Sequence, residues 1–333
     1  MANPIAKFRY KIIFWLLRFL QIQLFITTMS LPVLVWWGLP ISLLSPLGNL
    51  LFLPFLTVFL MLCSIIFFLE IAALPNGWFI YILEIVTSWW DKALTLGTGT
   101  QYLVGFSKPP LLFVLLIPLT SLFIVQNRYT KQLHRSILAL TLLLGLSFLY
   151  LKLIRPTSTF IETIPYKNEL VTLIKSKNQT IVIDPGCIGK KSSAQSWVEY
   201  TLAPNIIQKT GKNGIDHLIV LKLGIITFNY IEKLCSLMSI KTVYMPYWEG
   251  TLHKNGWRSF FFMRRALEKN GTKLVRIGKK PITVTFPEEK KLLITPLDKR
   301  IAYHDSTYPT CIITGQIANQ TIYIQNSSTK KSI

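Results

Sequence analysis

Few residues in this sequence have the types and spacing that metal binding requires. Its four cysteines show neither a CxxC pattern nor a cysteine–histidine ligand spacing, so we do not expect a zinc site; they are Cys63, Cys187, Cys235 and Cys311. His217 belongs to an apolar, strand-like run and His253 to a polar loop, which favours a structural role and a solvated role respectively. His304 and Asp305 are adjacent, and adjacent side chains seldom face one ligand. The isolated polar groups therefore predict no metal centre.

A nucleophilic site has equally little support. Ser193, His304 and Asp184 can be combined into a Ser–His–Asp set, but no nucleophile-elbow pattern surrounds the serine. Asp184 begins the turn Asp-Pro-Gly, where its carboxylate is expected to accept backbone N–H groups. Neither a GxGxxG nor a Walker A pattern is present, so nothing predicts a nucleotide site or a cofactor.

The basic residues suggest anion binding as a further candidate chemistry. The stretch "GWRSFFFMRRALEK" (Gly256–Lys269) places arginines and aromatic rings on one face of a predicted helix. Such a face can stack bases and pair phosphates of single-stranded DNA, or it can lie on anionic lipid. Alternatively, the rings pack on a sheet while the arginines face water. The residues concerned are Arg258, Phe261, Phe262, Arg264 and Arg265, together with Lys190 and Lys191, which offer phosphate contacts at another helix start or belong to a solvated loop.

The elements that must position these residues fall into two parts of different composition. The chain has 333 residues, of which 51% are hydrophobic, and a formal charge of +21. Leu, Ile, Phe and Trp dominate from Ile12 to Ile154, whereas apolar and polar residues alternate after Pro156. We therefore predict a helical membrane domain over residues 1–155 and a water-exposed domain over residues 156–333. The second part has 25 lysines and arginines against 12 acidic residues, which favours an anionic partner or serves solubility.

Five apolar runs approach the length of about 20 residues that a membrane span needs. They are Ile12–Met29, Leu50–Leu74, Trp78–Leu96, Pro110–Gln126 and Ser136–Ile154. Arg18 and Asp91 lie within two of them, where they either pair with each other or extend to the membrane interface. Three prolines interrupt Leu31–Asn49, which predicts a re-entrant or interfacial segment.

The positively charged loops predict the orientation. Asn127–Arg135 carries three basic residues, and the chain start carries Lys7, Arg9 and Lys11, so both are expected in the cytoplasm. Five spans then place the C-terminal domain outside. No small-residue cleavage site follows the first apolar run, so a cleavable signal peptide is not expected. We predict a multi-pass membrane protein with a cytoplasmic N-terminus.

Short β-branched runs alternate with helical patterns in the second half, which predicts an α/β arrangement. The predicted helices are Ser193–Leu202, Thr227–Met238 and Arg258–Lys269. The predicted strands are Val171–Ile174, Thr180–Asp184, His217–Leu221, Thr242–Pro246, Lys273–Ile277, Ile282–Phe286, Lys291–Thr295, Thr310–Thr314 and Gln320–Gln325.

Two regions of the chain resemble the ComEC-type competence proteins, which are membrane channels for DNA uptake. The first is Leu39–Leu60, where a turn with Asn49 leads into a span with Pro54, as in the membrane signature of that family. The second is "QTIVIDPG" (Gln179–Gly186) followed by "IDHLIVL" (Ile215–Leu221), which is similar to the opening strands of the family's metallo-β-lactamase-like domain. The resemblance implies a partial competence membrane domain and a truncated αββα fold.

The resemblance also implies a two-metal centre whose ligands this chain lacks. In that fold, a His-x-His-x-Asp-His loop follows the strand that corresponds to His217–Leu221. The four ligand positions fall here on Lys222, Gly224, Ile226 and Thr227, and none of them is an ordinary metal ligand. A later aspartate position falls near Asn326 or Ser327. The resemblance therefore implies a degenerate metallo-β-lactamase-like domain without hydrolase activity.

These expectations lead to three candidate functions. The first is a ComEC-like, non-catalytic membrane protein associated with the passage of single-stranded DNA across the inner membrane. Its expected partners are the lipid bilayer, single-stranded DNA, and other competence-channel subunits or a second copy of the chain. The second is a membrane-anchored structural or binding protein that keeps the fold without DNA transport. The third, a hydrolase with an unorthodox metal site, is disfavoured by the missing ligands.

Overall fold

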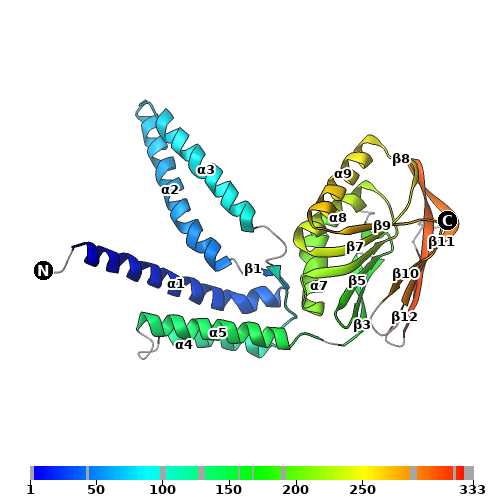
Figure 1. The fold of residues 1–333 in the computed structure, drawn as a ribbon, viewed down its shortest axis with the longest axis horizontal. Helices are drawn as coiled ribbons and strands as arrows, with labels where there is room; N and C mark the ends of the chain where they lie inside the picture. The colour runs from blue at the N-terminus through cyan, green and yellow to red at the C-terminus, as the bar shows by residue number, and fades with distance from the viewer. Residues whose placement is uncertain are drawn as a thin grey trace. The chain divides into compact units, whose positions relative to one another are not determined.

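The structure, a computed structural model, divides into two compact units (Figure 1). Residues 1–104 and 108–154 form the first unit, and residues 105–107 and 155–333 form the second. The structure describes residues 4–42, 45–97, 103–126, 132–156, 158–166, 169–188, 193–285, 291–317 and 320–325.

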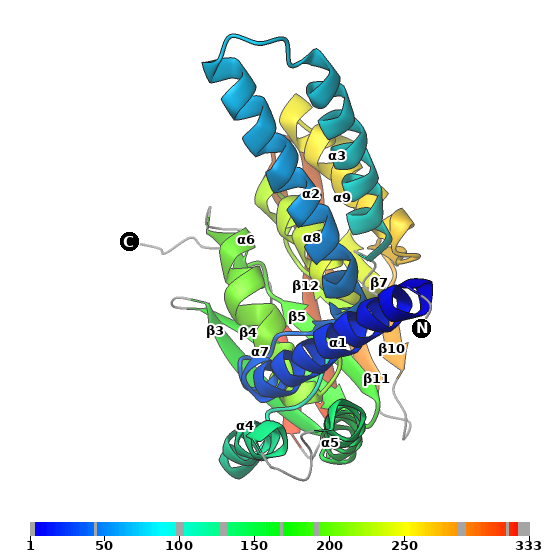
Figure 2. The ribbon, with the colours of Figure 1, turned by 90° about the vertical axis from the view of Figure 1, so that its left-hand side faces the viewer.

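The first unit is helical. Helix α1 packs along α4 and α5, whereas α2 and α3 form a hairpin of their own (Figures 1 and 2). A hydrogen bond of 2.9 Å from Gln21 Nε2 to Ser136 Oγ joins α1 to α5. The short strands β1 (Ile41–Ser42) and β2 (Leu103–Val104) pair in antiparallel orientation. The helices are α1 (Pro4–Trp36), α2 (Ser45–Ile71), α3 (Gly77–Gly97), α4 (Leu111–Gln126) and α5 (Leu133–Leu153).

The prediction of a five-span bundle is wrong. Within the described residues, two helices are long and apolar enough to cross a membrane, Ile13–Trp36 and Leu133–Leu153. Helix α4 has 16 residues and is therefore about 24 Å long, which is shorter than a hydrocarbon core of about 30 Å. Helix α3 carries three exposed charged residues, Glu84, Asp91 and Lys92, and the described apolar part of α2 is the short segment Phe55–Ile71. Hydropathy identified apolar runs with nearly the bounds of α3, α4 and α5, but not every such run is long and apolar enough for a span.

The segment Leu31–Asn49, predicted to be re-entrant or interfacial, is helical at both of its ends. Helix α1 continues through Pro32 to Trp36, strand β1 follows, and α2 begins at Ser45. Pro32 lies inside α1 and has no N–H group to donate to the carbonyl four residues before it. The side chains of Arg18 and Asp91 are both exposed.

The second unit contains two sheets. The first has the order β3-β4-β5-β6-β7-β9, in which β5, β6, β7 and β9 are parallel. In the second, β10-β11-β12-β13 are antiparallel, and β8 pairs with β12. The strands are β3 (Phe160–Tyr166), β4 (Glu169–Ser176), β5 (Gln179–Asp184), β6 (Gly214–Val220), β7 (Ser239–Pro246), β8 (Glu249–Thr251), β9 (Lys273–Ile277), β10 (Ile282–Thr285), β11 (Lys291–Tyr303), β12 (Asp305–Ile317) and β13 (Gln320–Gln325).

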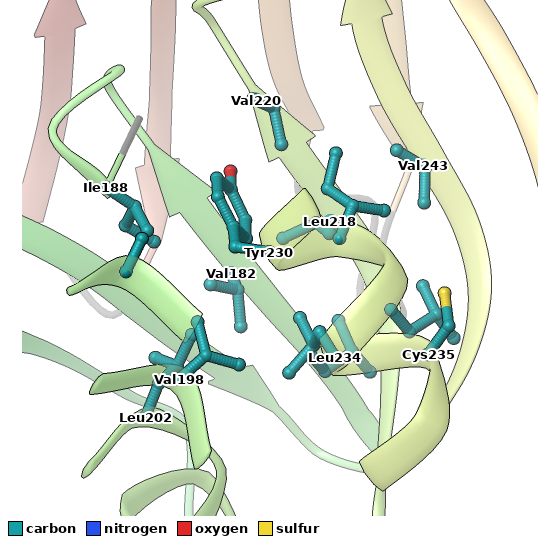
Figure 3. Packing of buried hydrophobic residues seen from close by; sticks show 14 of the residues in the cluster. Val182, Ile188, Val198, Leu202, Leu218, Val220, Tyr230, Leu234, Cys235 and Val243 are labelled. Carbon is teal, nitrogen blue, oxygen red and sulfur yellow. The ribbon is translucent and has the colours of Figure 1, made fainter. Parts of the chain in front are cut away.

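Each face of the first sheet is buried against a different layer. Val182, Leu218 and Val243 belong to the core that faces the helices (Figure 3). The alternate residues Ile181 and Ile183 belong to a second core, where they pack against the second sheet. Side chains of a strand alternate between its two faces, so this sheet is buried on both sides. The helices are α6 (Ala194–Trp197), the π-helical turn η4 (Val198–Leu202), α7 (Ala203–Thr210), α8 (Ile225–Leu237) and α9 (Lys254–Lys269).

The predicted αββα arrangement is wrong for the described residues of this unit, which form three layers: helices, first sheet and second sheet. The second core cluster contains residues of both sheets, and the helices contribute to the first cluster. Along much of β12, buried and less buried residues alternate. A sheet that alternates in this way has one face on the core and one face toward water, so it needs no second helical layer.

Candidate functional site

Asp184 closes β5 at the edge of the sheet where the parallel strands end. Its carboxylate is fully buried, and Oδ1 accepts backbone N–H groups from Gly186 at 2.9 Å, Cys187 at 2.8 Å and Ile188 at 3.3 Å. The Cys187 thiol also donates to Oδ1, and the Tyr230 hydroxyl donates to Oδ2 at 2.7 Å. Burial and the neighbouring Asp184 raise the pKa of Cys187 and of Tyr230. This cluster is a structural hub, because its carboxylate is occupied by protein donors.

The four positions implied as metal ligands form the connection from β6 to α8. Lys222 is half-buried, Gly224 is the N-cap of α8, Ile226 packs against the core on the helix side, and Thr227 is fully buried. No group of three or more His, Cys, Asp or Glu residues gathers anywhere in the described part of the chain. Asn326 and Ser327 lie outside the described residues.

Two tyrosines from the second sheet contact this connection. The Tyr303 hydroxyl accepts the Ile225 N–H group at 3.0 Å. Tyr308 is buried, which raises its pKa to about 12, although a hydrogen bond with the Leu223 backbone opposes the shift. The sequence analysis missed both residues. No local pattern marks them, since β11 and β12 extend well beyond the predicted strands.

Helices α8 and α9 begin close together at this edge. Strands β6, β7 and β9 are parallel, α8 connects β6 to β7, and α9 precedes β9. A Cβ atom on Gly224, at the start of α8, would lie 3.9 Å from Tyr303 Cε2, and one on Gly256, in the first turn of α9, would lie 3.8 Å from Tyr303 Oη. The Tyr303 side chain therefore lies beside the first turns of both helices. The N-terminal ends of helices carry partial positive charge and favour anions.

Two histidines that are distant in sequence lie at the same edge. The His253 and His304 rings are 5.3 Å apart, and the His304 ring is 4.8 Å from the ring of Tyr303. His253 caps α9, since its Nδ1 accepts the Asn255 N–H group at 3.4 Å. His304 has a positive φ of 52°, which turns the chain between β11 and β12. No pattern in the sequence pairs these two histidines.

His217 lies apart from this edge and takes part in a side-chain contact within the sheet. Its Nδ1 is 3.4 Å from the Tyr244 hydroxyl. Burial lowers the pKa of the imidazole, which favours its neutral form. This geometry suits the structural role expected for it.

Helix α9 presents a second candidate site, an aromatic and basic surface that we call the α9 face. It consists of Arg258, Phe261, Phe262, Arg264 and Arg265. Phe261 is 57% exposed and Phe262 is 45% exposed, and the Arg258 guanidinium lies 5.6 Å from the Phe262 ring centre. Arg264 pairs with Glu268 at 2.8 Å, and a shallow groove of about 400 Å³ runs between these side chains and the rings.

The aromatic residues of α9 divide between core and surface. Phe260 is buried and Trp257 is half-buried against the helix-side core, as expected if the rings pack on the sheet. Phe261 and Phe262 are exposed beside the arginines, which that interpretation does not explain.

The structure does not describe the side chains of the other residues that were predicted to take part in binding or in the membrane signature. Lys190 and Lys191 lie outside the described residues. Asn49 and Pro54 lie within α2, but their side chains are also outside the described part.

Comparison with known proteins identifies no family. No family model matches the chain, and no curated protein matches it. Among solved structures, the apo state of the chemotaxis sensor ODP from T. denticola is 12% identical, with a TM-score of 0.28, over 46% of this chain and 59% of that chain. The peroxy diiron species of the chemotaxis sensor ODP is 12% identical, with a TM-score of 0.25, over 45% of this chain and 58% of that one. Both matches span less than two thirds of the other chain, and similarity this low supports no inference about fold or function.

Proposed function

We propose that the protein is a membrane-anchored, non-catalytic protein that binds single-stranded nucleic acid on the α9 face. The observation that carries this proposal is the exposure of Phe261 and Phe262 beside Arg258 and Arg265. Base stacking on an aromatic ring contributes about 1–3 kcal/mol per base and tolerates any sequence. Exposed arginines supply the phosphate contacts.

The charges of the α9 face support an anionic partner. Arg264 is paired with Glu268, whereas Arg258 and Arg265 form no ion pair with any described residue. Their guanidinium groups are exposed and available for phosphate oxygens. The basic balance of residues 156–333 adds a favourable long-range attraction for a polyanion.

The membrane anchor in this proposal consists of α1 and α5. Both have the length and composition of a span, and α5 leads directly into the second unit, where Arg155 Nε donates to the Gly211 carbonyl at 2.8 Å. The sequence prediction placed the C-terminal domain outside because five spans from a cytoplasmic N-terminus end outside the membrane. Two spans do not support that argument. Two spans also put the N-terminus and the basic loop before α5 on opposite sides of the membrane, so the positive charges of both cannot be cytoplasmic. In this proposal the loop is cytoplasmic, which makes both the second unit and the N-terminus extracytoplasmic.

The resemblance to ComEC-type proteins suggests DNA as the strand and uptake across the bacterial inner membrane as its context. A translocation path needs more helices than this anchor provides. We therefore propose that other channel subunits or a second copy of this chain complete it. A binding role without transport is the alternative, and deletion of the gene followed by a DNA-uptake assay separates the two.

The test of binding uses the full-length protein in nanodiscs of neutral lipid and a fluorescent oligothymidylate. The double variant Phe261→Ala/Phe262→Ala should weaken binding by at least about tenfold, since two stacking contacts are lost. Lys279→Ala/Lys280→Ala is the control, because both lysines are exposed residues outside α9. No binding at low ionic strength, or equal affinity of the phenylalanine variant and wild type, would overturn the proposal. If the phenylalanine variant loses binding to anionic vesicles but keeps its affinity for the oligonucleotide, the α9 face binds lipid instead.

A further inference from the structure

A buried hydroxyl without a partner lies in the first turn of α8. Thr227 is fully buried, and its Oγ1 forms no hydrogen bond with any residue that the structure describes. Other buried threonines in helices bond the carbonyl four residues before them, as Thr28 does with Leu24 at 2.7 Å and Thr210 with Ile206 at 2.7 Å. Since an unpartnered buried hydroxyl is costly, Thr227 needs a physical explanation.

The Thr227 hydroxyl points toward the start of its own helix. A Cβ atom built on Gly224 would have Thr227 Oγ1 as its nearest neighbour, at 3.8 Å. Gly224 is the N-cap residue and has no side chain to bond the first-turn N–H groups. Because Gly224 has no Cβ atom, its backbone can be approached more closely than that of any other residue.

The groups around this point are hydrogen-bond donors. The first bond that closes the α8 backbone runs from Phe228 N to Gly224 O, so the N–H groups of Ile226 and Thr227 have no acceptor within the helix. The Tyr303 hydroxyl already accepts the Ile225 N–H group, which leaves its own proton to donate. The first turn of α9, with its partial positive charge, lies beside the Tyr303 hydroxyl.

We propose that the first turn of α8 binds a phosphate group through the Thr227 hydroxyl, the Ile226 and Thr227 N–H groups and the Tyr303 hydroxyl. Phosphate fits these groups because its several oxygens accept hydrogen bonds from different directions, and because its negative charge is stabilised at a helix N-terminus. Lys222, two residues before Gly224, adds positive charge to the same connection. The site shares no residue with the α9 face, so it is independent of the proposed function.

The test measures how inorganic phosphate affects the full-length protein in detergent. Thermal unfolding is followed in phosphate and in chloride at matched ionic strength, and calorimetry gives the affinity. Phosphate should raise the Tm of wild type, since a ligand that binds only the folded state stabilises it. Thr227→Val keeps the shape of the side chain and removes the donor, so phosphate affinity should fall by about tenfold or more. The variant should be at least as stable as wild type in chloride, because it removes an unpartnered hydroxyl.

Thr180→Val is the matched control. Thr180 is also fully buried with an unpartnered Oγ1, but it lies near the start of β5, at the opposite end of that strand from Asp184. It should change stability in the same direction as Thr227→Val and leave phosphate affinity unchanged. No Tm difference between phosphate and chloride for wild type, or wild-type phosphate affinity in Thr227→Val, would overturn the proposal.

Gly224→Ala tests the same site without removing a polar group. The added methyl group meets nothing closer than 3.8 Å, and the φ of 169° suits any residue, so the variant should fold. Because the methyl group occupies the space beside Thr227 Oγ1, phosphate affinity should again fall by about tenfold or more. Gly278→Ala, where a Cβ atom meets nothing within 4 Å, is the control. Wild-type affinity in Gly224→Ala would contradict the proposed position.

Competition distinguishes the sources of the phosphate group. If inorganic phosphate displaces an oligonucleotide from wild type but not from Thr227→Val, the site takes a phosphate of nucleic acid. If phosphate binds without displacing the oligonucleotide, the site takes free phosphate or a small phosphate ester. The Phe261→Ala/Phe262→Ala variant should retain phosphate binding in either case, which separates failure of this site from failure of the α9 face.

Discussion

The Tyr230 hydroxyl donates a hydrogen bond of 2.7 Å to Oδ2 of Asp184, and both groups are fully buried. Tyr230 extends from α8 (Figure 3), and Asp184 is the last residue of β5, so this bond joins the helix to the end of the strand. The same aspartate orders the turn at Gly186–Ile188 through its other oxygen. One carboxylate thereby joins the end of β5 to α8 and to the turn that follows β5.

Removing the tyrosine hydroxyl should therefore destabilise the second unit. Tyr230→Phe leaves Oδ2 of Asp184 buried without its partner, which costs on the order of 1–3 kcal/mol. Chemical denaturation followed by tryptophan fluorescence measures the change in the free energy of unfolding. Tyr200→Phe, at a tyrosine that is 75% exposed, is the control and should have little effect. Equal stability of Tyr230→Phe and wild type would contradict the role of this bond.

Lys175 should make stability depend on pH. Its side chain is almost fully buried, and Nζ donates to the carbonyls of Pro156 and Thr210. Burial, and then the nearby Lys212 and Arg155, lowers its pKa from 10.5 to about 8. Between about pH 8 and 10.5 the unfolded chain binds more protons at Lys175 than the folded protein, so its contribution to stability rises with pH in this window.

Lys175→Met removes this titration. The difference in unfolding free energy between wild type and the variant should change in favour of wild type from pH 8 to 10.5, measured by denaturation at each pH. Tyrosines, cysteines and the other lysines also titrate in this range. Their contributions to the unfolding free energy are the same in both proteins, so they cancel in the difference. A difference that stays constant across these pH values would show that Lys175 has an ordinary pKa.

The three cysteines of the second unit should not react in the folded protein. Cys187, Cys235 and Cys311 are all buried. Burial raises the pKa of Cys235 to about 12 and that of Cys311 to about 11, so little of the reactive thiolate is present near neutral pH. Ellman's reagent should modify these thiols only after denaturation. Rapid labelling of any of them under native conditions would contradict the described packing.

Gly250 should not tolerate a side chain. Its φ is +96°, and a Cβ atom would lie 2.2 Å from the Asp305 carbonyl oxygen, across the pairing of β8 with β12. Gly250→Ala should therefore lower the unfolding free energy by at least about 2 kcal/mol. Gly278→Ala serves as the comparison, since its Cβ atom meets no neighbour. Similar stability of the two variants would argue against the described β8 pairing.

The arginines of the α9 face should determine the salt dependence of strand binding. For single strands, the logarithm of the binding constant falls with the logarithm of salt concentration by about 0.7 per neutralised phosphate. Arg258→Ala/Arg265→Ala should reduce this slope by about 1.4 if each arginine contacts one phosphate. The measurement is a series of titrations between about 50 and 200 mM salt. If the slope of the double variant equals that of wild type, Arg258 and Arg265 do not contact the phosphates of the strand.

The sequence by itself determined the local elements of the second unit. The run Lys273–Ile277 was predicted with the bounds that β9 has, and Thr180–Asp184 differs from β5 by one residue. These predictions succeed because β-branched residues between turn formers restrict the backbone locally. The turn at Asp184 follows from the same local chemistry. The strand β3 and the helix α7 were missed, since Pro165 and Pro204 weaken their patterns.

Only the tertiary structure decided which of these elements come together and which faces stay exposed. Helical periodicity placed Phe261 and Phe262 with the arginines, but the packing of Phe260 on the core determined that they face outward. His253 and His304 meet because β8 pairs with the start of β12, where Thr251 lies opposite Asp305, and no local pattern encodes that pairing. The number of layers and of membrane spans also depends on where helices end and what covers each sheet. These are contacts between distant residues, and a local pattern carries little information about them.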